Sequence, residues 1–332
     1  MVATIKDIAR EAGVSISTAS NVLNNKTGVI KASEATRQRI LRAAESLDYS
    51  PSIMAKGLRS GKSGLAGVML PAIYGSFIPE ILQGIEDVLG ENGYNMLLCT
   101  FKDAEEFRKK WKILNAKKVD GVITLPSHEK SFIDAYTEMA GKIPLVFTAG
   151  RIDQLDIPFV YVPPEEIARL AARHLLQMGH RSIGVLGPRR GGFLDAFVDE
   201  TRKYPAVRYH VSREFTTFAD GAPEFHRLRK ALPDMTAVLA YNDEIAAAMI
   251  NATREAGLDV PRDLSVIGVD DLPICEMTRP RITTIAQPRR EQGSSAARLL
   301  LDIINREASP EGITLAPRLV TRQSCRELKK GR

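Results

Sequence analysis

The spacing of apolar residues changes once along this chain, at residues 61–64, where the sequence reads GKSG. Before this point the apolar residues are spaced for short, separately capped helices. After it, apolar runs alternate with amphipathic stretches. With 332 residues, the chain is also longer than one compact core usually requires. The sequence therefore predicts a small helical head followed by a larger α/β body of two lobes.

Short helices are predicted between residues 4 and 47. Thr4, followed three residues later by Asp7, is a capping-box pattern. The apolar residues of the helix that follows share one face: Ile5, Ile8, Ala9 and Ala12. Gly13 ends this helix, Ser15 caps a second helix, and Ser33 caps a third.

The second and third helices have distinct faces. The inward residues are predicted to be Ala19, Val22 and Leu23 in the second helix, and Ile40, Ala44 and Leu47 in the third. The outward face of the second helix has no charge and consists of Ile16, Ser17, Ser20 and Asn21. The third helix offers Arg37, Arg39 and Arg42 to solvent or phosphate. Two helices joined at a glycine turn form a helix-turn-helix, whose second member lies in the major groove of DNA.

Charge supports the same interpretation. Residues 1–62 contain ten Lys and Arg against five Asp and Glu, so they carry +5 of the chain's net charge of +6. A basic domain on a nearly neutral body indicates a polyanion partner, because neutralised phosphates release counterions. Ser17, Ser20 and Asn21 are short polar side chains suited to base edges, although singly they would equally suit a solvated helix face.

Three stretches resemble the DNA-binding head and hinge of the lac repressor family (LacI/GalR). They are TIKDIAREAGVSISTASNVLNN at residues 4–25, ATRQRILRAAESLDYSP at 35–51 and AKGL at 55–58. The resemblance implies an all-α helix-turn-helix head with a hinge helix, followed by an α/β two-lobed body like the periplasmic binding proteins. It implies base contacts from Ile16, Ser17, Ser20 and Asn21. Contacts with the DNA backbone are implied for Lys6, Ser20, Asn24, Thr36 and Arg37.

The head departs from the family pattern in two places. Most members carry Arg at the position of Asn21, so the usual two-point contact with guanine is lost and a half-site with adenine is expected there. The loop at residues 25–31 is a few residues longer than usual. We expect this loop to alter the seating of the third helix without changing the mode of docking.

A very short helix is predicted after Pro51, capped by Ser52. Such a helix is unstable alone, and Gly57 in its interior costs about 1 kcal/mol more, so we expect it to form only with DNA and a partner chain. The resemblance implies that Leu58 enters a minor-groove base step with Ala55 packed beside it. A plain linker is the alternative.

Beyond residue 64, strands and helices alternate. Strands are predicted near residues 65–70, 94–99 and 121–125, and helices near 78–89 and 105–117. Helices that close on Gly93, Gly179 and Gly257 each lead into another strand. This alternation predicts parallel sheets covered by helices on both faces.

The body resembles the family's ligand-binding core. The matching stretches are GIEDVLGENGYNMLLC at 84–99, KKVDGVITLP at 117–126, HLLQMGHRSIGVLG at 174–187, AYNDEIA at 240–246, VPRDLSVIGVDD at 260–271 and RPRITTIAQP at 279–288. The resemblance implies a head at 1–50, a hinge at 51–62 and a core at 63–332. Its first lobe spans about 63–159 and 288–316, and its second about 160–287 and 317–326. The chain would thus cross between lobes near Phe159, Gln287 and Ala316.

The resemblance also implies an effector site in the crevice between the lobes. The implied residues are Phe77, Arg189, Phe215, Asn242 and Asp270. The loop before Arg189 is shorter than in the family, and Thr148 and Pro163 replace residues that are commonly acidic. A sugar, a nucleoside or a small acid would fit, and a crevice that no longer binds a small effector is the alternative.

Other classes of protein fit less well. The N-terminus has no secretory signal and no stretch suits a membrane span, which favours a cytoplasmic protein over an exported one. GLRSGKS at 57–63 is one residue short of a phosphate-binding loop and precedes a strand. Cys99, Cys275 and Cys325 have no metal or redox spacing and suit a reducing compartment. Neither an enzyme nor a cofactor is therefore expected.

Together these observations predict a transcription regulator, most simply a repressor. It would bind a pseudo-palindromic operator in double-stranded DNA as a homodimer, because two heads on a twofold axis match two half-sites. A small effector between the lobes would change the spacing of the hinges. The sequence has no heptad tail, so a dimer is expected and not a tetramer.

Overall fold

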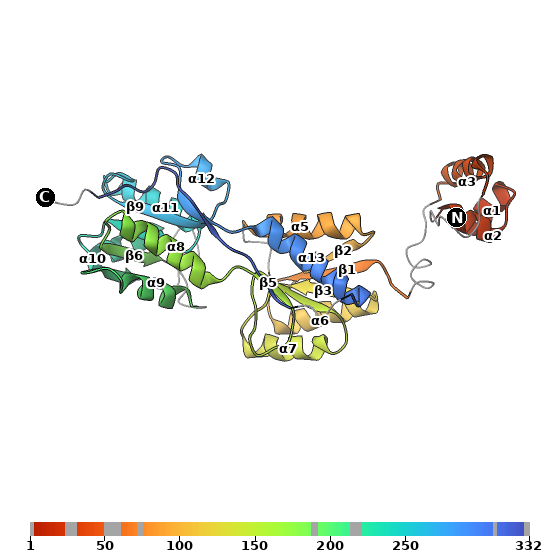
Figure 1. Cartoon of the computed structure of the whole chain (residues 1–332), viewed down its shortest axis with the longest axis horizontal. Helices are drawn as coiled ribbons and strands as arrows, with labels where there is room; N and C mark the ends of the chain where they lie inside the picture. The colour runs from red at the N-terminus through yellow and green to blue at the C-terminus, as the bar shows by residue number, and fades with distance from the viewer. Residues whose placement is uncertain are drawn as a thin grey trace. The chain divides into compact units, whose positions relative to one another are not determined.

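The computed structural model describes residues 3–23, 32–49, 61–71, 76–186, 192–212, 221–307 and 311–328. The chain divides into two compact units. One is Met1–Leu65 with Lys118–Asp120, and the other is Ala66–Lys117 with Gly121–Arg332. We call them the head unit and the body. Figure 1 colours the whole chain from red at the N-terminus to blue at the C-terminus.

The described part of the head folds into α1 Ile5–Glu11, α2 Ile16–Leu23 and α3 Glu34–Ser46. The caps predicted at Thr4, Ser15 and Ser33 are confirmed, and the cap predicted at Ser52 lies outside the described residues. The backbone N–H of Thr4 donates to the Asp7 carboxylate at 2.9 Å. The hydroxyls of Ser15 and Ser33 each accept from the backbone N–H three residues further on, at 3.1 and 3.2 Å. Short polar side chains thus satisfy N–H groups that the first turns leave unpaired.

The core of the head consists of Ile8, Ala9, Ala12, Ala19, Ile40 and Ala43. Two predicted positions were wrong. Ser20 is buried, because α2 contacts both α1 and α3 and its inward face is wide enough to include the neighbour of Ala19. Leu47 is exposed, because α3 ends at Ser46 and Ala43 occupies the core position instead.

The first lobe of the body contains a sheet with strand order β11-β5-β4-β3-β1-β2. Its strands are β1 Leu65–Leu70, β2 Asn95–Thr100, β3 Gly121–Thr124, β4 Leu145–Thr148, β5 Phe159–Tyr161 and β11 Ile313–Thr314. The pairs β1–β3, β3–β4, β4–β5 and β5–β11 are parallel. Helices α5 Ile78–Glu91 and α13 Arg289–Asn305 cover one face and lie side by side in Figure 1, although they are distant in sequence. Helices α6 Ala104–Ala116 and α7 Lys130–Ala140 cover the other face through a cluster of aromatic side chains.

The second lobe contains a sheet with strand order β12-β10-β9-β8-β6-β7. Its strands are β6 Ser182–Leu186, β7 Arg208–Val211, β8 Ala237–Ala240, β9 Ser265–Asp270, β10 Thr283–Ala286 and β12 Arg318–Val320. They are parallel except for β12, which runs antiparallel to β10. Helices α8 Pro164–Gln177 and α9 Phe193–Thr201 cover one face. Helices α10 Gly221–Ala231, α11 Asp243–Glu255 and α12 Ile274–Met277 cover the other. The predicted two-lobed α/β body is therefore confirmed.

Three segments cross between the lobes. The first crossing follows Tyr161, two residues beyond Phe159, near which it was predicted. The reason is that Phe159 begins β5, which pairs with β4 in the first sheet. The chain returns at residues 287–288, between β10 and α13, and crosses again at 315–317, between β11 and β12.

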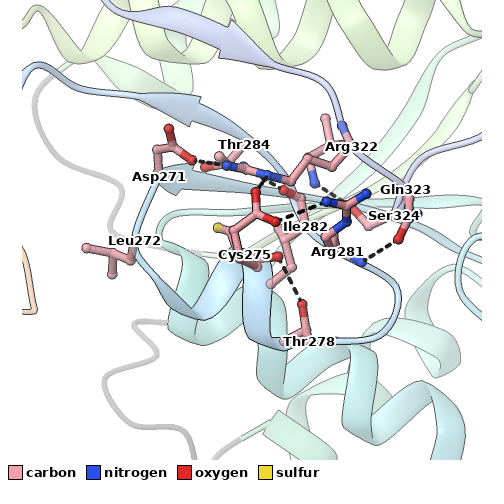
Figure 2. Close-up of polar contacts among 12 residues, drawn as sticks. Asp271, Leu272, Cys275, Thr278, Arg281, Ile282, Thr284, Arg322, Gln323 and Ser324 are labelled. Atoms are coloured by element: carbon pink, nitrogen blue, oxygen red, sulfur yellow. Dashed lines mark hydrogen bonds and ion pairs between the residues drawn. The ribbon is translucent and has the colours of Figure 1, made fainter.

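The segment after β12 fastens the end of β9 in the second lobe. The guanidinium of Arg322 donates to the carboxylate of Asp271 at 2.7 Å and to that of Glu276 at 2.6 Å. Figure 2 shows the side chain of Arg322 reaching Asp271. Ser324 accepts from the backbone N–H of Thr283 at 2.8 Å. These bonds fix the strand end that carries Asp270.

Candidate functional site

The exposed surface of α2 is the candidate DNA-reading face of the head. Ile16 is 46% exposed, Ser17 is exposed and Asn21 is half-buried. Ser20, which was expected on this face, is only 5% exposed, so its hydroxyl is not presented to a base edge. The described face is therefore uncharged and consists of Ile16, Ser17 and Asn21.

Basic and polar groups on α1 and α3 are the candidate backbone contacts. Lys6 and Arg37 are both exposed. Thr36 is half-buried, and its hydroxyl lies 2.9 Å from that of Ser33. Five further expected site residues lie outside the described residues: Asn24, Ala55, Leu58, Arg189 and Phe215.

A pocket of 710 Å³ opens between the lobes of the body. It brings together three of the predicted effector residues, Phe77 from the first lobe and Asn242 and Asp270 from the second. Phe77 immediately precedes α5, Asn242 precedes α11 and Asp270 ends β9. Each residue thus lies where a helix begins or a strand ends, which is where ligands of parallel α/β sheets bind.

Asp270 is held by neighbouring side chains. Its carboxylate accepts from the side-chain amide of Gln287 at 2.7 Å and from the guanidinium of Arg289. Its backbone φ is 108°, and that of Asp271 is 62°. Residues in this left-handed region cost of order 1–3 kcal/mol each and persist only when their surroundings hold them. The bond from Arg322 to Asp271 is one such restraint.

Arg289 lines the pocket and was not predicted from the sequence. Its guanidinium carbon lies 4.4 Å from the centroid of the Phe77 ring. The same group donates to the side-chain oxygen of Gln292 at 3.1 Å. Arg289 is 8% exposed. A buried cation–π contact of this kind fixes both the ring and the cation.

Asn242 and Asp243 begin α11 with different roles. The Asn242 side-chain oxygen accepts from the backbone N–H of Ile245 at 2.8 Å. This bond does not use the N–H groups of the Asn242 side-chain amide. Asp243 is fully buried and accepts from the hydroxyl of Thr284 at 2.6 Å and the backbone N–H of Leu272 at 2.8 Å. Burial raises the pKa of Asp243 to about 7, although these bonds act in the opposite direction. Asp243 therefore supports the pocket wall from within the second lobe.

Several other pocket residues were missed by sequence reasoning: Arg151, Asp153, Tyr161, Glu165, Tyr241 and Glu244. The Arg151 guanidinium lies 5.0 Å from the centroid of the Tyr161 ring and 2.9 Å from the Asp153 carboxylate. Burial raises the pKa of both Tyr161 and Tyr241. Tyr161 ends β5 and Tyr241 directly follows β8, so their place at the carboxyl ends of strands was the usable signal.

The chemistry of this lining suits a polar ligand with a flat or ring-shaped face. Aromatic side chains supply apolar surface, while Asn242, Asp270 and Arg151 supply donors and acceptors. Among the described residues, no group of three or more His, Cys, Asp or Glu side chains is placed to hold a metal ion. Within the same residues, no helix is both long and apolar enough to cross a membrane.

The chain is similar to known proteins over nearly its whole length. The model of the bacterial regulatory proteins of the lacI family matches residues 4–52, and that of the periplasmic binding protein-like domain matches residues 172–325. The HTH-type transcriptional regulator RegA of Clostridium saccharobutylicum is 32% identical, over 98% of this chain and 99% of that protein. A lac repressor dimer bound to operator and the anti-inducer ONPF superposes with a TM-score of 0.85 at 26% identity, over 98% of this chain and 100% of that one.

A third similar protein binds a sugar. The transcriptional regulator CelR in complex with cellobiose superposes with a TM-score of 0.72 at 27% identity, over 97% of this chain and 99% of that one. Both units of the chain and the order in which they occur are thus shared with transcription regulators along nearly the whole sequence. The chain belongs to the lacI family of bacterial regulatory proteins, with a DNA-binding head and a periplasmic-binding-protein-like body.

Proposed function

We propose that this chain is a sequence-specific transcription repressor that binds a pseudo-palindromic operator as a homodimer and responds to a polar effector. The observation that carries the proposal is the uncharged, exposed face of α2 beside the exposed cations Lys6 and Arg37. Uncharged side chains read base edges, while cations fix the register on phosphates. The similar lac repressor binds its operator as a dimer, which supports the proposed assembly.

In this proposal, Ile16, Ser17 and Asn21 contact bases, and Lys6, Asn24, Thr36 and Arg37 contact the DNA backbone. From the sequence resemblance, Ala55 and Leu58 are assigned to the minor groove. Such a protein acts on chromosomal DNA, so we place it in the cytoplasm. The similar proteins are regulators by their names, and we assign this chain no enzymatic activity.

The effector is assigned to the 710 Å³ pocket between the lobes. A sugar is the class that we favour, because hydroxyl groups can meet Asp270 and Asn242 while the sugar ring packs on Phe77 or Tyr241. The cellobiose complex of CelR supports this class. A second candidate is a regulator without a free effector. It is favoured by one observation, namely that Arg289 and Gln287 already bind Asp270.

Two experiments on the full-length protein test the proposal. Selection of bound sequences from a random duplex pool should enrich one pseudo-palindrome, and enrichment of none would refute sequence-specific binding. Thermal unfolding should then be followed with cellobiose, ribose, glucose, nucleosides and small carboxylic acids. A rise in melting temperature with one of the sugars supports the favoured class, since a ligand that binds only the folded state stabilises it. A rise confined to nucleosides or acids refutes it, and no rise with any compound supports the second candidate.

A further inference from the structure

We propose that Arg289 is a positioning residue that couples the state of Asp270 to the arrangement of the two lobes. This inference rests on the proposed function, in which Asp270 belongs to the effector site. In the structure the guanidinium of Arg289 binds the carboxylate of Asp270 directly. An effector that hydrogen-bonds to Asp270 must therefore share that carboxylate with Arg289 or displace the guanidinium.

The contact joins the two lobes. Arg289 is the first residue of α13, which packs on the first sheet, whereas Asp270 is the last residue of β9 in the second sheet. Their side chains are 9% and 7% exposed. Solvent therefore screens this ion pair little, and loss of the pair would remove a contact from both lobes. Ser76 and Glu244 form another hydrogen bond from the first lobe to the second, between the starts of α5 and α11.

The pair is incomplete in the present arrangement. One carboxylate oxygen of Asp270 accepts from both Gln287 and Arg289. The Nε–H of Arg289 is buried and has no hydrogen-bond partner within the described part of the chain. Arginine and carboxylate bind most strongly through two parallel bonds, and this pair uses one. A small movement of either lobe, or an acceptor on a ligand, would thus change the strength of the contact.

A displaced guanidinium has polar space to enter. A second pocket of 380 Å³ shares Asp270, Gln287 and Arg289 with the effector pocket, so these side chains separate the two cavities. The second pocket is also lined by the acidic residues Glu80 and Glu291 and by the cations Arg290 and Arg318. The two carboxylates offer an alternative partner to the Arg289 guanidinium. If the Arg289 guanidinium switches between Asp270 and these carboxylates, the protein has two discrete states. Coupling between a ligand and a conformation requires two such states.

The test compares Arg289→Met, Asp270→Asn and the double variant in the full-length protein without any ligand. Each single variant leaves one buried group uncompensated and should melt well below the parent, whereas the double variant removes both charges and should recover most of the melting temperature. Hydrogen–deuterium exchange is then measured in peptides that contain the crossing amides of Val162, Gln287, Leu315 and Ala316, because the prolines at positions 163, 288 and 317 carry no amide hydrogen. If the pair positions the lobes, the double variant should exchange roughly tenfold faster at these crossings despite its recovered stability.

Arg290→Met is the matched control. The Arg290 guanidinium binds Asp87 at 2.6 Å within the first lobe, so its loss should leave exchange at the crossings unchanged. Arg289→Lys keeps the charge but loses the guanidinium's bond to Gln292 and its planar contact with the Phe77 ring, and should give intermediate exchange even if the other variants fold poorly. Parental exchange at the crossings in the double variant or in Arg289→Lys would overturn the proposal. Because no ligand is added, this result is independent of whether an effector is found.

Discussion

Gly84 of α5 lies so close to Arg290 of α13 that a Cβ atom on Gly84 would be 2.0 Å from the Arg290 carbonyl oxygen. The contact is reciprocal, because a Cβ atom on Gly293 would lie 2.0 Å from the carbonyl oxygen of Ile81. The two helices therefore meet through their backbones. This crossing places the start of α13, with Arg289, against Phe77 at the start of α5.

Gly84→Ala should destabilise the body. A methyl group at this position collides with backbone atoms, which cannot rotate away as a side chain can, so the helices must separate. Overpacking of this kind costs about 1–3 kcal/mol and occasionally more. Urea unfolding of the purified protein measures the change in the free energy of unfolding.

Gly90→Ala is the control for this substitution. Gly90 lies on the same helix and is exposed, and a Cβ atom on it would meet no atom of another described element within 4 Å. Alanine is a better helix former, so this variant should be as stable as the parent or more stable by up to about 1 kcal/mol. Equal stability of the two variants would show that the α5–α13 crossing tolerates a methyl group.

His180 should make the stability of the second lobe depend on pH. The ring is fully buried, and its Nε2–H donates to the carbonyl oxygen of Arg326 at 3.1 Å while Nδ1 accepts from the Thr236 hydroxyl, 3.0 Å away. Burial lowers the pKa of His180 from 6.5 to about 4. As the pH falls, His180 therefore takes up a proton at a higher pH in the unfolded chain than in the folded protein. The stabilisation by the neutral ring is complete above pH 6.5 and is lost as the pH falls toward 4.

A drop from pH 7 to pH 5 should cost roughly 2 kcal/mol through this group. The check is to compare urea unfolding of the parent and of His180→Gln at both pH values. The variant should be less stable at pH 7 and should lose less stability between the two. His210→Gln, on the exposed face of β7, is the control and should follow the parent. An equal pH dependence in the parent and in His180→Gln would contradict the assignment.

The sequence specified the local structure better than the tertiary contacts. Caps at Thr4, Ser15 and Ser33 depend on residues three positions away, so they could be predicted from the local sequence. The burial of Ser20 depends on how α1 and α3 pack around α2, and helical periodicity does not contain that information. Arg289 was missed for a similar reason. Its partner Asp270 is 19 positions away in the other lobe, and only the fold brings the two together.

In the pocket between the lobes, the residues predicted by resemblance were those at strand ends and helix starts. Phe77, Asn242 and Asp270 line the pocket, as do Arg151 and Glu244, to which the sequence analysis assigned no role. Arg151 follows β4 after two residues and stacks on Tyr161 of the adjacent strand β5. Such pairs depend on strand order, which a single sequence does not specify.

Asn21→Ala should change which bases the head prefers at one symmetric pair of operator positions. Asn can make a two-point contact with adenine, and the loss of such a contact reduces discrimination by about 1–3 kcal/mol. Selection from a random duplex pool, repeated with the variant, measures this preference. Arg39→Ala, on the exposed face of α3, is the control and should weaken binding without changing the order of preference. An unaltered preference in Asn21→Ala would remove Asn21 from the base contacts.

Lys6→Ala should weaken the salt dependence of operator binding while leaving sequence preference unchanged. Lys6 is exposed on α1, and each neutralised phosphate contributes about 0.9 to the slope of log K against log salt concentration. With two heads, the slope should therefore fall in magnitude by about 2. Fluorescence anisotropy with the selected operator at several salt concentrations measures this slope.

Arg10→Ala is the matched control, since Arg10 lies on the same helix and its guanidinium is 3.4 Å from the carboxylate of Asp7. The Arg10 variant should keep a slope close to that of the parent. If Lys6→Ala also kept the parental slope, Lys6 would make no phosphate contact and the docking of α1 against the backbone would have to be reassigned.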